Sequence, residues 1–251
     1  MVKNVLILTL LCLVIMPSFA KAEDAKPLQL AVFNPVQLVP EDESIKGARL
    51  SLFYAVNEDV TGLSLVWLGA NRATGDVKGA EIGLGNWVEG SAYGLQLGLV
   101  NHAGERCVGL QYGAVNILGG DFTGVQWGFV NWTEGFMHGG QAGIVNISKG
   151  QSAGIDLGIV NYSEGLFKGF QAGFVNYAAE MHGFQLGLVN YTKSLDGLQI
   201  GLANYNGNKD PWSSWFLSIG RSSPLRTRFP HRERVKNLRR ICFRGIIRME
   251  V

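Results

Sequence analysis

An eight-residue unit, G-x-Q-x-G-x-x-N, recurs at fixed spacing through the middle of this 251-residue chain. Every copy keeps both glycines and the asparagine, and the third position is Gln except at Glu81 and Asp156. A period this regular is typical of repeat architectures, in which each repeat forms one structural unit. The copies begin at Gly79, Gly94, Gly109, Gly124, Gly139, Gly154 and Gly169, in steps of 15, and at Gly183 and Gly197, in steps of 14.

The residues between the fixed positions alternate in a way that predicts β-structure. Positions 2, 4 and 6 of each unit are mostly apolar, as in Leu95, Leu97 and Leu99. Period-two alternation is the signature of a strand. Segments such as WTEG, YSEG and ISKG between the units contain turn-forming residues. We therefore expect an all-β fold with nine equivalent strands, whose positions 2, 4 and 6 (Leu97, Trp127 and Leu157 among them) face the core.

The constant step favours a β-solenoid, in which each 15-residue repeat is one coil stacked on the last. Coil length is then fixed, and identical residues form columns at about 4.8 Å spacing. Asn116, Asn131 and Asn146 are expected in one such column, and stacked amide side chains can hydrogen-bond along it.

The alternative is an antiparallel outer-membrane β-barrel. Aromatic residues after the asparagines, such as Trp132 and Tyr162, resemble the interfacial girdle of such barrels. However, three outward apolar residues cover about five residues of strand, whereas a bilayer-crossing strand needs roughly 9 to 11. A pore or barrel function remains open as the alternative at this point.

The chain ends differ from the repeats. Residues 1–22 combine Lys3, an apolar run from Val5 to Met16 and a small-x-small site at Ala20–Ala22, which predicts a cleaved secretory signal peptide. Residues 23–61 are expected to form an N-terminal β cap, and residues 62–208 the repeat domain. We therefore expect an exported protein.

The repeat units resemble a family of exported, mostly uncharacterised surface-repeat proteins of double-membraned bacteria built from GLQLGLVN-type units. The resemblance covers about Leu28 to Asn208. It implies a location in the periplasm, the outer membrane or on the cell surface, and the family supplies no catalytic residues. The expected partner is an envelope or surface component, with outer-membrane association as one form of it.

Residues 209–251 form a basic, atypical tail. From Trp212 onward there are nine arginines and one lysine against Glu233 and Glu250, and the glycine spacing stops. A displaced reading frame explains both changes, and such a tail would contact Gly79–Asn204 little. It would also leave Leu198, Ile200 and Leu202 near an unprotected edge. Nucleic acid is not an expected partner of an exported chain, although a basic tail can bind anionic surfaces.

No constellation of catalytic, cofactor or metal-binding residues is found in the sequence. His102, His138 and His182 occupy variable positions of different repeats, and a metal site needs converging ligands. Glu81 and Asp156 lie five repeats apart, roughly 24 Å at the spacing of stacked strands. Cys107 is expected to be a small buried apolar residue. We therefore expect a non-enzymatic cell-envelope or surface protein with a structural or binding role and no cofactor.

Overall fold

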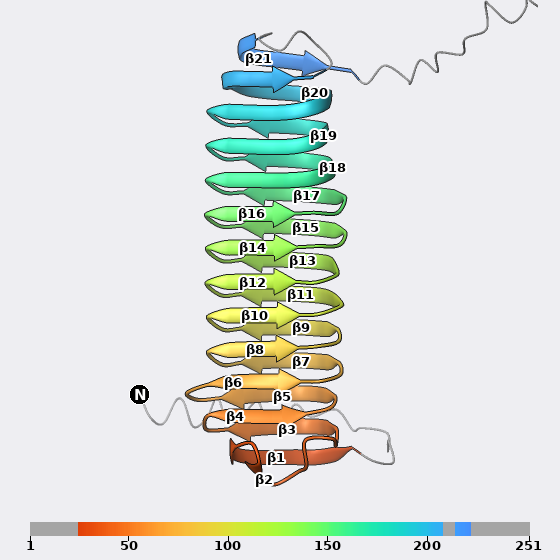
Figure 1. Cartoon of the computed structure of the whole chain (residues 1–251), viewed down its shortest axis with the longest axis vertical. Helices are drawn as coiled ribbons and strands as arrows, with labels where there is room; N and C mark the ends of the chain where they lie inside the picture. The colour runs from red at the N-terminus through yellow and green to blue at the C-terminus, as the bar shows by residue number, and fades with distance from the viewer. Residues whose placement is uncertain (1–24, 208–213, 222–251) are drawn as a thin grey trace, which may run out of the picture. The chain divides into compact units, whose positions relative to one another are not determined.

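The computed structural model describes residues 25–207 and 214–221, and these form a β-solenoid of about 12 turns with about 15 residues each. Figure 1 shows the coils stacked along one axis, each with a strand on either side. The expected signal peptide and residues 222–251 of the basic tail lie outside the described residues.

The strands of the first half are β1 (Lys26–Phe33), β2 (Val36–Gln37), β3 (Ile45–Ser51), β4 (Tyr54–Asn57), β5 (Val60–Val66), β6 (Ala70–Ala73), β7 (Val77–Ile82), β8 (Gly85–Val88), β9 (Ala92–Leu97), β10 (Val100–Ala103) and β11 (Arg106–Tyr112). Those of the second half are β12 (Val115–Leu118), β13 (Asp121–Trp127), β14 (Val130–Thr133), β15 (Met137–Ala142), β16 (Val145–Ser148), β17 (Ser152–Leu157), β18 (Val160–Ala172), β19 (Val175–Leu186), β20 (Val189–Asn206) and β21 (Ser214–Gly220).

Neighbouring coils pair in parallel with the repeat units in register. Gln96 lies beside Gln111, and Asn101 beside Asn116, each 15 residues further along the chain. This arrangement confirms the solenoid and excludes the antiparallel barrel. The stack begins before residue 62, because Gly47 of β3 already pairs in register with Gly62 of β5.

Eight of the nine repeat units contain a corner between two strands, so the expectation of one strand per unit is wrong for them; the ninth, Gly197–Asn204, lies within β20. In the coil that begins at Ala92, β9 ends at Leu97 and β10 starts at Val100. The second glycine of the unit, Gly98, lies at this corner. A Cβ atom on Gly98 would lie 2.8 Å from the carbonyl oxygen of Gly83 and 2.9 Å from Nδ2 of Asn86. The coil therefore turns where only glycine fits.

The expected burial of positions 2, 4 and 6 is also wrong: Trp127 is 59% exposed and Leu157 46%. The first glycine of every unit has a φ between 126° and 148°, and a Cβ there would overlap a carbonyl of the preceding coil. Positions 1 and 5 thus leave no room for a side chain against the preceding coil. Alternation then places position 3, the glutamine, inside and the apolar positions 2, 4 and 6 outside.

The asparagine column is a hydrogen-bonded ladder in the interior. Asn116 donates from Nδ2 to Asn131 Oδ1 at 2.8 Å and to the backbone oxygen of Trp127 at 3.1 Å. The same pair of bonds recurs from Asn86 to Asn190, and these side chains are buried. The predicted column of Asn116, Asn131 and Asn146 is confirmed.

The glutamine column forms a second ladder that runs in the opposite direction. Gln126 Nε2 donates to Gln111 Oε1 at 2.7 Å, toward the N-terminal end, whereas each asparagine donates toward the C-terminal end. Because the two columns pair nearly all of their amide groups within the stack, with Oε1 of Gln199 as an exception, most of these groups are buried without an unpaired-group penalty.

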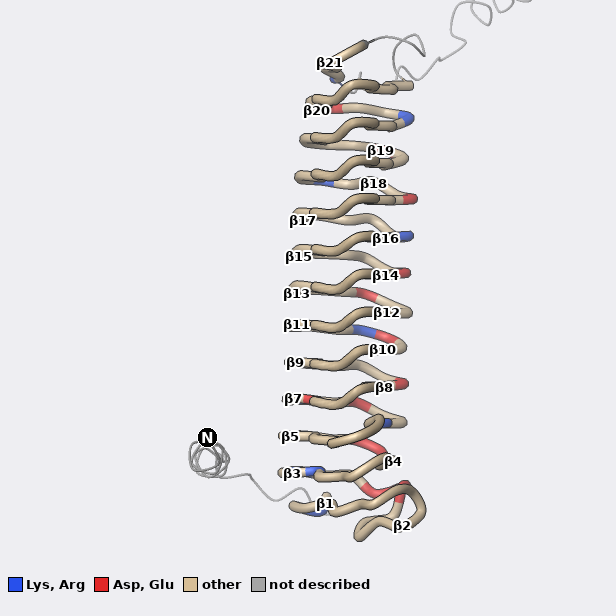
Figure 2. Tube along the Cα trace, turned by 90° about the vertical axis from the view of Figure 1, so that its left-hand side faces the viewer, with Lys and Arg blue, Asp and Glu red and all other residues tan. Residues whose placement is uncertain are grey.

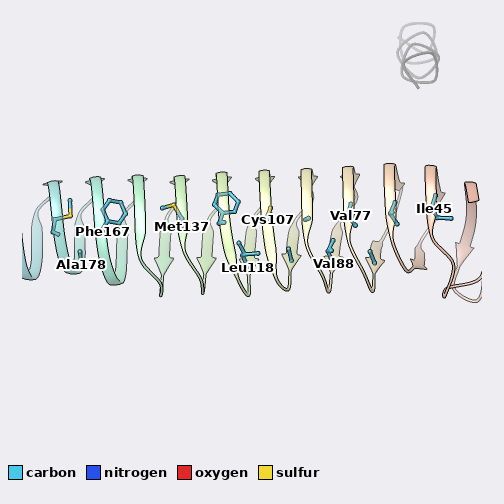
Figure 3. Packing of buried hydrophobic residues seen from close by; sticks show 14 of the residues in the cluster. Ile45, Val77, Val88, Cys107, Leu118, Met137, Phe167 and Ala178 are labelled. Atoms are coloured by element: carbon cyan, nitrogen blue, oxygen red, sulfur yellow. The ribbon is translucent and has the colours of Figure 1, made fainter. Parts of the chain in front are cut away.

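Two apolar columns complete the interior. One is formed by the residue two before each unit, such as Cys107, Met137 and Phe167, with Ser152 as its polar exception. The other is formed by the residue two after each asparagine, which is apolar at Val88, Ala103, Leu118 and Ala178 and is Thr, Ser or Asn in the remaining units. Figure 3 shows these side chains in line along the stack. The core is therefore a narrow apolar strip beside two polar ladders.

Both ends of the stack are covered by strands. At the N-terminal end, Gln29 exchanges hydrogen bonds with the backbone of Val39, at 2.8 and 2.9 Å, in place of a preceding coil. At the other end, β21 pairs antiparallel with β20 and covers Leu198 and Ile200. The expectation that the chain after Trp212 leaves this edge open is thus wrong for Ser214–Gly220.

Replacing Asn131 by alanine is expected to lower the free energy of unfolding by about 1–3 kcal/mol. The substitution removes the donor to Asn146 Oδ1 and to the backbone oxygen of Ala142, both inside the stack. Chemical denaturation measures the change, and Thr123→Ala on the exposed outer surface is the control. Equal stabilities of the two variants would contradict a stabilising role for the ladder.

Candidate functional surface

One long edge of the solenoid is apolar, and we call it the apolar edge. It is formed by positions 4 to 7 of the nine units. None of its residues carries a charge, and the edge runs for roughly 40 Å at the spacing of stacked strands. The residues are 82–85, 97–100, 112–115, 127–130, 142–145, 157–160, 172–175, 186–189 and 200–203.

The large side chains of the apolar edge are exposed. Phe129 is 63% exposed, Phe174 60% and Leu99 59%. They lie at the corners between two strands, directly after the second glycine of each unit. Contiguous exposed apolar surface of this extent is unusual on a soluble monomer and marks an interaction site.

The opposite edge of the coils is charged, and we call residues 89–91, 104–106, 119–121, 134–136, 149–151 and 164–166 the charged edge. It holds ion pairs between neighbouring coils, such as Lys149 with Glu134 at 3.0 Å and Arg106 with Asp121 at 3.6 Å. Figure 2 shows that charged residues colour only short segments of the trace. Each coil therefore has an apolar and a charged side.

Aromatic side chains lie between these two edges, at the position directly after the asparagine of several units. Tyr162, Tyr177, Tyr191 and Tyr205 stack in sequence, with ring centroids 4.8, 5.2 and 4.3 Å apart. Trp132 reaches the charged edge, since its Nε1 donates to Glu134 at 3.1 Å. Around each coil the surface thus changes from apolar to aromatic to charged.

The apolar edge contains a hollow of about 370 Å³ at Ala114. Leu99 and Phe129 occupy the same position in the coils on either side, so the smaller Ala114 leaves a gap between them. Tyr112 and Trp127, in edge-to-face contact with centroids 5.9 Å apart, line one side of it. The lining is apolar apart from the tyrosine hydroxyl, the indole N–H and backbone atoms.

The residues that the sequence analysis considered as possible metal ligands or reactive groups lie far apart in the structure. His102, His138 and His182 lie in different coils, and no cluster of metal-binding side chains occurs among the described residues. Burial lowers the pKa of His102 and raises the pKa of Cys107 to about 12. Cys107 is therefore an inert thiol in the apolar strip.

Glu81 and Asp156 occupy the glutamine column, five coils apart, as the register implies. Sequence reasoning missed the partner of Glu81, which is Arg49, 3.2 Å away and also fully buried. Arg49 stands in the same column two coils earlier. The signal was Gly47, placed 15 residues before Gly62, which puts Arg49 at the third position of an earlier unit.

The described residues include no helix long and apolar enough to span a membrane. Comparisons of the chain with protein-family models, curated proteins and solved structures found no match.

Proposed function

We propose that this chain is a non-enzymatic protein of the bacterial cell envelope that associates with a lipid surface through its apolar edge. The observation that carries the proposal is the uninterrupted, charge-free row of exposed apolar side chains along nine coils. Each coil adds apolar side chains to the row, so the apolar area that contact would remove from water grows with the number of repeats.

The order of side chains around each coil favours lipid over a protein partner. Ile159, Tyr162 and Glu164 follow one another from the apolar edge toward the charged edge. Tyrosine and tryptophan between an apolar and a charged region suit the lipid–water interface, where the ring is buried and its polar atom stays hydrated. The predicted signal peptide and the resemblance to surface-repeat proteins support an envelope location.

Vesicle flotation tests this function. The purified protein is expected to float with phosphatidylcholine vesicles, and the double variant Phe129→Asp/Phe174→Asp to bind at least about tenfold more weakly, because it exposes two charges to the bilayer instead of two apolar rings. Both positions are exposed in the free protein, so the fold should survive.

A matched control is available on the charged edge. The side chain of Phe136 is 59% exposed, a fraction similar to that of Phe129. Phe136→Asp therefore makes the same chemical change at a residue outside the apolar edge. This variant should float like the wild type. Binding that requires anionic lipid and disappears at high salt would instead indicate the arginine-rich tail. A stable dimer that fails to float would show that a second copy covers the edge, and would overturn the proposal.

A further inference from the structure

Asp156 interrupts the glutamine ladder in the middle of the solenoid. It lies in register between Gln141 and Gln171, and its side chain is fully buried. Neither of its carboxyl oxygens has a hydrogen-bond partner among the described residues. A buried carboxyl group without partners is costly in the ionised form.

The direction of the hydrogen bonds along the glutamine ladder determines which bonds a side chain at position 156 would have to donate and accept. Gln126 shows the complete pattern: it donates to Gln111 and accepts from Gln141, both at 2.7 Å. A residue in the middle of the column must therefore donate toward the N-terminal end and accept from the other side. An ionised carboxylate can only accept, whereas a protonated carboxyl group can do both.

Glu81 illustrates the opposite case at the N-terminal end of the same ladder. It accepts from Gln96 Nε2 at 2.9 Å and faces Arg49 on its other side. At this end of the ladder the side chain only has to accept hydrogen bonds, which an ionised carboxylate can do. The guanidinium of Arg49 balances the negative charge of Glu81. Asp156 has neither the terminal position nor a buried cation beside it.

The surroundings of Asp156 are polar but uncharged. In the apolar strip, Ser152 replaces the larger Met137 and Phe167 of the adjacent coils, and its hydroxyl is also buried without a partner among the described residues.

The neighbouring polar groups are engaged elsewhere. Gln171 Nε2 donates to Ser163 Oγ at 3.2 Å, and Gln141 Oε1 accepts from Ser148 Oγ at 3.2 Å. The charged or titratable side chains of the elements packed against Asp156 lie on the outer surface, where His138 of β15 and Lys168 and Glu164 of β18 are exposed. Burial raises the pKa of Asp156 to about 7, and the nearby Gln171 amide offsets this only in part.

We propose that Asp156 is a pH-sensitive site of the solenoid: its neutral carboxyl group is accommodated in the uncharged interior, and its ionisation places an unpaired charge there and loosens the coil from Ser152 to Ser163. This regulatory role is independent of lipid binding by the apolar edge.

The direction of the pH effect follows from the raised pKa. The native state holds a proton on Asp156 up to about pH 7, whereas the unfolded chain loses it near the ordinary value of 3.8. The stability that this group contributes is therefore complete below about pH 4, declines as the pH rises to about 7, and stays constant above that. Over this window the opening equilibrium of the coil should increase up to about tenfold per pH unit.

Asp156→Gln supplies the test, because glutamine donates and accepts at every pH. Thermal unfolding and hydrogen exchange of the peptide 145–172 are measured from pH 4 to pH 8.5 for the wild type and the variant, with the coil around Gln111 as internal reference. The wild type should lose melting temperature and protection relative to Asp156→Gln as the pH rises to 7, and the difference should then level off.

A second variant and a direct titration test the same proposal if Asp156→Gln is unstable. If Asp156→Gln does not fold, Asp156→Asn provides the uncharged comparison, and a carbon NMR titration of the wild-type aspartates reads the Asp156 carboxyl directly. Identical pH profiles for wild type and variant, or a carboxyl that titrates near pH 4, would overturn the proposal. Titration near 7 with a profile specific to this coil would support it.

Discussion

Replacing Glu81 by glutamine is expected to lower the free energy of unfolding by about 3–5 kcal/mol, the range typical of breaking a buried ion pair. Arg49 then keeps its charge in the interior without a carboxylate. Its guanidinium still reaches Ser64 Oγ at 2.7 Å and the backbone oxygen of Arg72 at 2.7 Å, but these neutral acceptors do not balance the charge. Burial already lowers the pKa of Arg49 to about 10, although Glu81 opposes that shift. Chemical denaturation measures the loss.

Two variants separate the charge effect from a general sensitivity of the stack. Glu89→Gln removes the carboxylate of an exposed ion pair with Arg72, and should leave stability nearly unchanged because solvent screens that pair. The triple variant Arg49→Gln/Ser64→Gln/Glu81→Gln should recover most of the loss, since it extends the uniform glutamine column toward Gln29. A triple variant no more stable than Glu81→Gln would contradict this account of the pair.

The stacking of the coils could be predicted from the sequence because the repeat length itself carries the information. A step of 15 maintained from Gly79 to Gly169 leaves each coil the same length, so residues of the same position meet in parallel register. The asparagine column followed directly from this. A barrel places no such demand on loop length, which is why the regular spacing was decisive.

The orientation of the strands could not be predicted, because the usual rule that apolar residues face inward fails here. The interior beside Gly94 and Gly98 is too narrow for side chains, and the glutamine between them satisfies its amide within a ladder. Leu95, Leu97 and Leu99 consequently face outward. Alternation gives the period of a strand but does not show which of its two faces is buried.

The sequence pattern therefore identified the residues of the candidate surface but predicted them to lie in the core. The same residues that were expected to form the core, such as Trp127, form the exposed apolar edge. Arg49 was missed for a different reason. In the coil that contains Arg49, Ala55 occupies the place beside Asn71 where later coils have an asparagine. The G-x-Q-x-G-x-x-N motif therefore cannot be recognised in that coil.

The glycines of the repeat have distinct roles, and two adjacent residues allow these to be separated. Gly139 has a φ of 133°, and a methyl group there would overlap the backbone oxygen of Gly124. Gly140 occupies the outward position 2, and a methyl group there would meet only the backbone oxygen of Ile155, at 3.6 Å. The stack requires glycine at position 139, whereas it does not require glycine at position 140.

Gly139→Ala is therefore expected to lower the free energy of unfolding by at least about 3 kcal/mol, through an unfavourable φ and displacement of the preceding coil. Gly140→Ala should be neutral or stabilising by up to about 1 kcal/mol, because it restricts the unfolded chain without strain. Parallel denaturation of the two variants measures both effects. Similar losses at the two positions would mean that the inward and outward faces of β15 have been assigned incorrectly, and with them the outward direction of the whole apolar edge.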